Sequence, residues 1–142
     1  MEKIELTTQN VGQYLTDCLE LQRHLVKEGE PIEEDQFLAT AADSHSYFLG
    51  ILNETKQLIG LGVLSKVVHL VRSNGYINNI VVHPNERGRG LFGDIMDALE
   101  QKAIEWGCPR IVLTCSRSEV QGLYKKRGYQ RKDTEFYYKN VS

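Results

Sequence analysis

The feature of this sequence that most constrains its fold is a glycine-rich turn between a β-rich segment and an amphipathic helix. Residues 76–82 are rich in β-branched side chains and predict a strand. After the turn, the apolar stripe of a helix is formed by Phe92, Ile95, Met96, Leu99, Ala103 and Ile104. Gly107 is suited to end this helix, and Pro109 prevents its continuation. The pattern predicts a strand that leads directly into the N-terminus of a long helix.

The turn has the composition of an anion-binding site. It reads Arg87-Gly88-Arg89-Gly90, and a helix N-terminus offers unpartnered N–H groups and the positive end of the helix dipole. Glycines let a phosphate approach the backbone, and arginines add charge beside it. We predict a diphosphate cradle, the alternative being an ordinary strand–helix turn with exposed arginines. The predicted cradle residues are Arg87, Gly88, Arg89, Gly90, Leu91, Phe92 and Gly93.

The sequence lacks the signatures of other phosphate-binding and nucleic-acid-binding proteins. It has no GxxxxGK[ST], and its one GxGxxG, at residues 88–93, has no acidic residue about 20 residues on at the end of a following strand. The formal net charge is -2, whereas nucleic-acid binders usually carry a basic excess. We therefore expect no nucleoside-triphosphate loop, no dinucleotide fold and no nucleic-acid partner.

Length and composition favour a single globular domain over residues 1–142. The chain is 41% hydrophobic and 25% charged, as in soluble proteins with one core. No apolar run approaches the roughly 18–20 residues that span a bilayer, and residues 1–8 lack the apolar core of a signal peptide. We expect a cytoplasmic protein with no membrane partner. Cys18, Cys108 and Cys115 lack metal-ligand spacing and are expected to be buried apolar residues rather than nucleophiles or zinc ligands.

Periodicity along the chain predicts a mixed α/β sheet with helices on its faces. The expected strands are residues 2–7, 47–52, 57–68, 76–82, 110–115 and 129–139, the second and third forming an antiparallel hairpin. The expected helices are residues 11–26, 33–42, 92–104 and 116–128. Gly29 and Pro31 are suited to end the first helix, and Ser116 with Glu119 has the spacing of a capping box. Residues 72–75 are expected to form a loop.

Residues 81–90 resemble the signature of the GNAT superfamily of acyl-CoA-dependent N-acetyltransferases, in which a strand is followed by [RQ]-x-x-G-x-[GA]. Arg87 takes the first position of this motif and Gly90 the fourth. The sixth position, normally Gly or Ala, is Phe92, and Gly93 follows one place later. Phe92 is expected either to change the geometry of the last cradle amide or to narrow the cofactor channel.

Three further segments extend the resemblance in the order found in the superfamily. Residues 75–82 resemble its central strand, residues 111–116 the next strand, and residues 123–129 its terminal LYxxxGF segment. The resemblance covers residues 57–139, and residues 1–50 match only in outline. It implies a GNAT-like fold, an α/β (α+β) architecture in which a mixed, mostly antiparallel central sheet is flanked by helices on both faces.

The resemblance also implies an activity and a set of site residues. In the superfamily the cradle binds the pyrophosphate of coenzyme A, and an acetyl group passes directly from acetyl-CoA to an amine in a ternary complex. The backbone of Ile80, Val81 and Val82 matches the part of the central strand that contacts the pantetheine and polarises the thioester carbonyl. Tyr124 matches the tyrosine that contacts the cofactor and protonates its thiolate, the alternative being a core or capping tyrosine. Acetyl-CoA is the implied co-substrate, with no metal.

The sequence offers no obvious general base. Asn78 and Asn79 stand where many relatives carry a carboxylate, and an asparagine side chain cannot accept a proton at neutral pH. Asn78 is the candidate to bind the acceptor or to order a water. Histidine titrates near neutral pH, so His83 and His69 are alternatives, although a surface or capping role is expected for His83. A water chain, or an amine that is partly neutral, would need no dedicated base.

The acceptor is expected to be a primary amine of a small molecule or a peptide. An acidic cluster between the first two helices is either a solvated loop or an attractant for such a cation; it comprises Glu28, Glu30, Glu33, Glu34 and Asp35. Residues 72–77 are similar to those of relatives that acetylate amino-sugar phosphates. Asn78 and Asn79 replace acidic residues of those relatives, so the acceptor stays open.

Two other functions are weighed against this interpretation. One is a GNAT-fold module that binds acyl-CoA as a sensor without turnover, favoured by Phe92 and the missing carboxylate and disfavoured by Tyr124. The other is a protein-binding domain that uses a sheet edge and no cofactor. Dimers are frequent in the superfamily, so a homodimer is a further expectation, with residues 136–138 either at its interface or in the core.

Overall fold

The computed structural model describes residues 1–26, 30, 33–115 and 117–142. The strands in this part of the chain are β1 (Glu2–Glu5), β2 (Ser46–Leu52), β3 (Leu58–Val68), β4 (Ser73–Val82) and β5 (Arg110–Val112). The helices are α1 (Leu15–Gln22), α2 (Glu34–Ala42), α3 (Leu91–Glu105) and α4 (Ser118–Lys126), with 3-10 turns η1 (Val11–Tyr14) and η2 (Pro84–Glu86). The ends expected at Gly29 and Pro31 and the cap expected at Ser116 lie outside the described residues. None of the described helices is long and apolar enough to cross a membrane.

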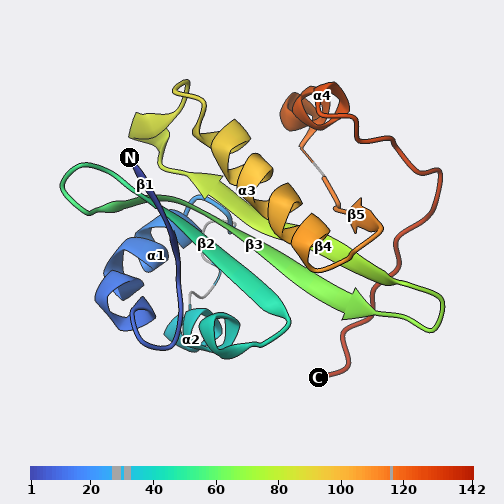
Figure 1. Ribbon diagram of the computed structural model, residues 1–142, viewed down its shortest axis with the longest axis horizontal. Helices are drawn as coiled ribbons and strands as arrows, with labels where there is room; N and C mark the ends of the chain where they lie inside the picture. Colours follow the sequence, from blue (N-terminus) through green and yellow to red (C-terminus); the bar gives the residue numbers. More distant parts are fainter. Residues whose placement is uncertain (27–29, 31–32, 116) are drawn as a thin grey trace.

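The strands form one sheet in the order β1-β2-β3-β4-β5 (Figure 1). Neighbours from β1 to β4 run antiparallel, and β5 runs parallel to β4. The expected hairpin of β2 and β3 is therefore confirmed. A parallel strand needs a crossover connection, and α3 supplies it between β4 and β5.

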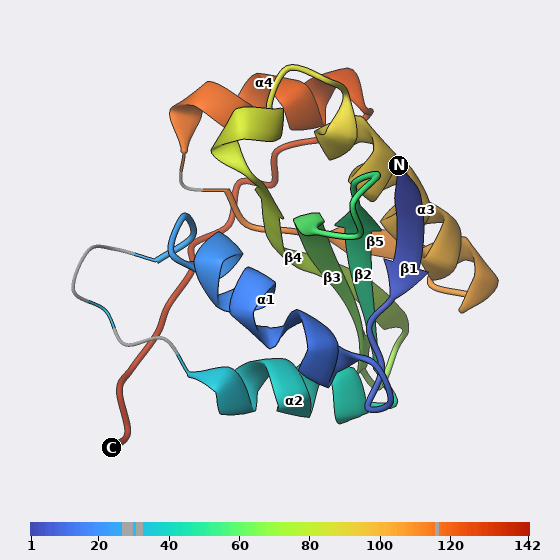
Figure 2. The same cartoon turned by 90° about the vertical axis from the view of Figure 1, so that its left-hand side faces the viewer.

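Helices cover both faces of the sheet (Figure 2). The core on the side of α1 and α2 includes Leu6, Val11, Cys18, Leu21, Phe37 and Phe48. On the opposite face, α3 buries Leu91, Ile95, Met96, Leu99 and Ala103. The expected fold class, a mixed and mostly antiparallel sheet flanked by helices on both faces, is confirmed.

Four expected elements differ from those observed. The loop expected at residues 72–75 is wrong, because the β3–β4 ladder continues until Ser73 pairs with Val68. The first helix is shorter than expected, with η1 followed by α1, and β5 ends at Val112. The strand expected at residues 129–139 is also wrong, since the described residues contain no strand after β5. Aromatic composition favours a strand, but a strand also needs a neighbour to bond with.

Candidate active site

The glycine-rich turn places two exposed glycines at the N-terminus of α3. Gly88 and Gly90 have φ values of 80° and 82°, in the left-handed region that glycine adopts without strain. A Cβ at either position would meet no atom of the described chain within 4 Å, so the backbone here faces open space. Gly90 is the N-cap of α3 and supplies no side-chain cap, so the first N–H groups of α3 keep their capacity to donate. The turn is thus an exposed group of amides at a helix N-terminus.

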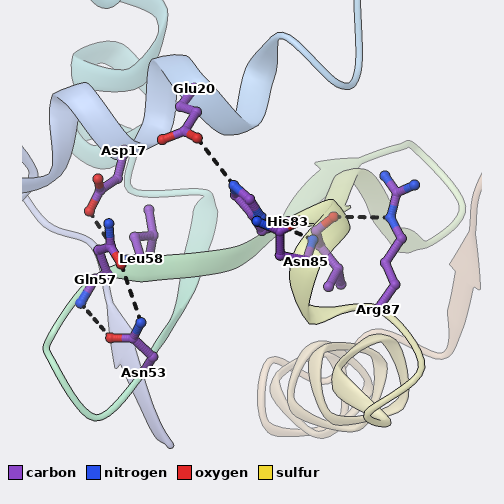
Figure 3. A network of polar contacts seen from close by, with 9 residues as sticks. Asp17, Glu20, Asn53, Gln57, Leu58, His83, Asn85 and Arg87 are labelled. Carbon is purple, nitrogen blue, oxygen red and sulfur yellow. Dashed lines mark hydrogen bonds and ion pairs between the residues drawn. The ribbon is translucent and has the colours of Figure 1, made fainter.

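The two arginines of the turn differ in their contacts. The Nε of Arg87 donates a hydrogen bond of 3.3 Å to the carbonyl oxygen of Val82, at the end of β4 (Figure 3). Arg89 forms an ion pair with the carboxylate of Glu86 in η2. Both arginines are exposed. An anion at the turn could therefore use the remaining donors of Arg87 directly, whereas Arg89 would have to exchange Glu86 for the anion.

His83 caps the 3-10 turn η2 that precedes the glycines. Its Nδ1 accepts a hydrogen bond of 3.2 Å from the N–H of Asn85, and its Nε2 lies 3.1 Å from the carboxylate of Glu20 in α1 (Figure 3). Accepting at Nδ1 assigns the proton of the neutral ring to Nε2, which donates to Glu20. Because both nitrogens are engaged, His83 is poorly placed to act as a base. His69 is exposed in the turn between β3 and β4, away from the glycines.

Acidic side chains gather at a cavity that sequence reasoning missed. Its volume is about 270 Å³, and it is lined by Asp17, Glu20, Gln57, Leu58, Ile59, His83, Asn85 and Glu86. Each of these carboxylates has a partner: Glu20 contacts His83, Glu86 pairs with Arg89, and Asp17 accepts a hydrogen bond of 3.0 Å from the N–H of Leu58 (Figure 3). The acidic cluster predicted from the sequence does not line this cavity. Its described members Glu30, Glu33, Glu34 and Asp35 are exposed, and Glu28 lies outside the described residues.

Only part of the β4 edge that faces β5 is paired, and the part next to the glycine-rich turn pairs with no described strand. Among the described residues, β5 pairs with Asn74–Tyr76 alone, at the far end of β4. A bulge between Asn78 and Val81, where Asn79 has a φ of 55°, then bends β4. Strand residues alternate in the side to which their backbone groups point. Some backbone N–H and C=O groups of residues 80–82 therefore point toward the β5 side of the sheet at a place where β5 no longer pairs with β4. An extended ligand can bind to them there.

Tyr124 of α4 lies against the first turn of α3. Its ring is 5.6 Å from that of Phe92 and 5.9 Å from that of Tyr129, both in edge-on contact. Burial raises the pKa of Tyr124, and the nearby Cys115 raises it further. The phenol therefore keeps its proton at neutral pH, which is the state that a proton donor requires.

Polar contacts hold α4 against α3 around this ring. The guanidinium of Arg127 pairs with the carboxylates of Asp97 and Glu100, both on α3. The hydroxyl of Tyr129 donates a hydrogen bond of 2.7 Å to Glu100 as well. Because Arg127 follows Tyr124 by less than one helical turn, these contacts fix the position of the phenol relative to α3.

The two residues predicted to be catalytic lie on different faces of the sheet. Ile77 is buried in the core beneath α3, where Tyr124 also packs. Alternation along β4 places Asn78 on the other face, toward α1. There its side-chain oxygen accepts a hydrogen bond of 2.9 Å from Asn79. The structure thus brings Tyr124 to the glycine-rich turn but does not bring Asn78 to Tyr124.

Comparison with known proteins decides the family. Residues 11–129 match the model of the acetyltransferase (GNAT) family. The chain belongs to the GNAT family. Among solved structures, an acetyltransferase from Trypanosoma brucei is 24% identical, with a TM-score of 0.79 over 98% of this chain and 99% of its own. Glucosamine-6-phosphate N-acetyltransferase from Arabidopsis thaliana is 20% identical, with a TM-score of 0.79 over 99% and 98% of the two chains. Ribosomal-protein-alanine N-acetyltransferase from Brucella melitensis is 19% identical, with a TM-score of 0.76 over 99% and 100%.

The solved GNAT structures share the fold of this chain but differ from one another in their acceptors. Their names give a sugar phosphate as the acceptor in one and a protein in another. The family match includes the glycine-rich turn, β4 and Tyr124, and it ends at Tyr129. The exposed residues 130–142 of this GNAT chain lie outside it.

Proposed function

We propose that this protein is an N-acetyltransferase that moves an acetyl group from acetyl-CoA to a primary amine of a small molecule or a peptide. The observation that carries the proposal is the pair of open, left-handed glycines at the N-terminus of α3, next to the free edge of β4. A diphosphate fits this place because Gly88 and Gly90 leave space where any other residue would project a Cβ. Membership of the GNAT family supports the same reaction class.

Two parts of the chain would share the binding of acetyl-CoA. The N–H groups of residues 88–92 and the guanidinium of Arg87 would hold the pyrophosphate. The free backbone groups of residues 80–82 would bond the pantetheine amides as a neighbouring strand does. Acetyl-CoA supplies the activated thioester, and a β4 N–H that bonds the carbonyl oxygen would stabilise the negative charge that develops there.

Tyr124 and water would carry the protons of the reaction in a ternary complex. The amine nitrogen bonds to the acetyl carbon, the carbon–sulfur bond breaks, and the sulfur takes the proton of the Tyr124 hydroxyl. The amine gives its own proton to water, because Asn78 and Asn79 cannot accept one, and Tyr124 takes a proton back from water before the next turnover. From the α1 face of the sheet, the amide of Asn78 can orient the incoming amine by a hydrogen bond.

Calorimetric titration with acetyl-CoA tests the cofactor site. We expect micromolar binding by the wild type and at least a tenfold weaker affinity for Arg87→Ala, since a charge-assisted hydrogen bond contributes roughly 1.5–3 kcal/mol. Arg72→Ala is the matched control, because it removes the same charge from an exposed position in the β3–β4 turn. An equal loss in both variants, or no binding at millimolar acetyl-CoA, would contradict the proposed site.

The two asparagines of β4 favour a second candidate, an acyl-CoA-binding module without turnover. Detection of free thiol during incubation with acetyl-CoA and a panel of primary amines separates the two functions. Amine-dependent thiol release that falls strongly in Tyr124→Phe supports the transferase. Binding of acetyl-CoA without thiol release, for every amine in the panel, supports the binding module.

A further inference from the structure

Glu86 places a carboxylate of the protein itself at the anion cradle. Its side chain forms an ion pair with Arg89, one of the two arginines of the glycine-rich turn. The carboxylate is the better buried partner, since the side chain of Glu86 is 19% exposed and that of Arg89 is 57% exposed. One cradle arginine therefore already has an anion in the unliganded protein, and this anion is attached to the chain.

The 3-10 turn η2 holds this carboxylate in place. Pro84 begins the turn, where the fixed φ of proline suits a helical conformation. The N–H of Glu86 donates a hydrogen bond of 2.9 Å to the carbonyl oxygen of His83. The imidazole of His83 caps the same turn by accepting from the N–H of Asn85. Because the backbone of Glu86 is fixed in this way, little conformational freedom is lost when its side chain pairs with Arg89.

Arg87, the other arginine of the turn, is held differently. Its Nε donates to the carbonyl oxygen of Val82, a neutral group, which leaves the terminal nitrogens of the guanidinium for another acceptor. In the described part of the chain, Arg87 takes part in no ion pair. An anion can thus bind Arg87 without breaking an ion pair, whereas it reaches Arg89 only by displacing Glu86.

Displacement would leave Glu86 beside other acidic side chains. Glu86 lines the cavity of about 270 Å³ together with Asp17 and Glu20. Both of these carboxylates already have partners, Asp17 in the N–H of Leu58 and Glu20 in His83. Carboxylates that face one cavity repel each other, so a released Glu86 would be exposed to like charge. This repulsion adds to the free energy needed to separate Glu86 from Arg89.

We propose that Glu86 is a built-in competitor of the cofactor pyrophosphate, which occupies Arg89 in the unliganded protein and is displaced when acyl-CoA binds. The proposal rests on the proposed function, because it takes the pyrophosphate of acyl-CoA as the incoming anion. Arg89 exchanges one anion for another, and no proton or covalent bond changes hands. Glu86 thereby lowers the affinity of the cradle, and its return to Arg89 favours the release of CoA after the reaction.

The sign of a single substitution separates this role from its opposite. If Glu86 kept its contact with Arg89 while the pyrophosphate bound, it would orient the guanidinium toward the phosphate, and its removal would weaken binding. Removal of a competitor instead tightens binding. Exposed ion pairs change an equilibrium by up to about fivefold, so we expect Glu86→Gln to bind CoA roughly twofold to fivefold more tightly than the wild type.

Calorimetric titration with CoA measures this sign, since CoA carries the pyrophosphate of acetyl-CoA but has no acetyl group to transfer. Asp94→Asn is the matched control, because it removes one carboxylate from the first turn of α3, where Asp94 has no ion pair with a described residue. The affinity of this control should stay closer to that of the wild type than to that of Glu86→Gln, and Arg89→Ala should bind more weakly. Unchanged or weaker binding by Glu86→Gln, or an equal gain in Asp94→Asn, would overturn the proposal.

The same titrations distinguish failure of the exchange from failure of the cofactor site. If the wild type binds CoA and Arg87→Ala weakens this binding, but Glu86→Gln brings no gain, the exchange alone is overturned. If neither the wild type nor Glu86→Gln binds millimolar CoA, the cradle and the proposed function fail, and the exchange fails with them.

Nitrogen-15 NMR of the arginine side chains observes the exchange without relying on a change in affinity. The Nε–H signal of Arg89 is identified by its absence from the spectrum of Arg89→Ala. Without ligand, Glu86→Gln should shift this signal, and saturating CoA should shift it in the wild type. A signal that Glu86→Gln leaves in place would mean that there is no pair to displace. A signal that CoA leaves in place would mean that Arg89 stays with Glu86, and either result overturns the proposal.

Discussion

Replacing Gly90 by alanine tests the backbone conformation on which the cradle depends. Gly90 has a φ of 82°, where an L-residue costs roughly 1–2 kcal/mol because its Cβ approaches the following carbonyl oxygen. A Cβ there would meet no atom of the described chain within 4 Å, so no steric clash adds to this cost. The expected loss in the free energy of unfolding is therefore conformational, about 1–2 kcal/mol.

Urea unfolding followed by circular dichroism measures this loss. The dependence of the unfolding free energy on urea is about 1–3 kcal/mol per molar for proteins of this size. The midpoint of Gly90→Ala should therefore fall by roughly 0.3–2 M. Titration of the folded variant with acetyl-CoA should also show weaker binding, because a turn that relaxes away from positive φ redirects the amides at the start of α3.

Gly122→Ala is the matched control for this prediction. Gly122 lies inside α4, without a positive φ, and a Cβ there also meets no described atom within 4 Å. Alanine is favoured over glycine inside a helix by about 0.5–1 kcal/mol, so the midpoint of this variant should rise. If the midpoint of Gly90→Ala equalled or exceeded that of the wild type, the left-handed turn would be refuted as the basis of the cradle.

Three other residues give predictions about packing and titration. Gly62→Ala should destabilise the protein by about 1–3 kcal/mol in the same assay, because its Cβ would lie 2.7 Å from the side chain of Ile95; an unchanged midpoint would show that α3 can shift freely. Burial, reinforced by a neighbouring carboxylate, raises the pKa of Cys18 to about 12. Its thiol should thus react with a disulfide reagent only after unfolding, and three rapidly reacting thiols in the native protein would contradict this. Burial also raises the pKa of Tyr124, so loss of its proton should slow acetyl transfer only above about pH 10. A decline near neutral pH that is absent from Tyr124→Phe would argue against this assignment.

Local chemistry explains why the sequence predicts α3 and its N-terminal turn well. The apolar stripe of the helix depends on residues three and four positions apart, and four of its expected members are buried, namely Ile95, Met96, Leu99 and Ala103. Gly107 has a φ of 71°, as expected for a residue that ends a helix. Gly88 and Gly90 take a left-handed conformation that glycine adopts more readily than any other residue. Each of these features can be recognised without knowing any distant neighbour.

Pairing between distant residues explains what the sequence does not predict. Residues 72–75 have the composition of a turn, yet the ladder with β3 draws them into β4. Residues 129–139 have the composition of a strand, and no partner strand is found for them among the described residues. The cavity beside His83 joins residues from α1, the start of β3 and η2. Such features depend on contacts that no local pattern encodes.

Phe92 shows how a departure from the family pattern can be understood from its contacts. The GNAT motif normally has Gly or Ala at this position, and the sequence suggests that a large side chain would disturb the cradle or its channel. In the structure the ring makes edge-on contact with Tyr124, 5.6 Å away, while the backbone at Gly88 and Gly90 stays open. Such aromatic contacts contribute about 0.5–1.5 kcal/mol beyond their burial. Phe92 therefore links α3, the helix that begins at the cradle, to α4. In this chain the large side chain at that position helps to hold the phenol of Tyr124 in place.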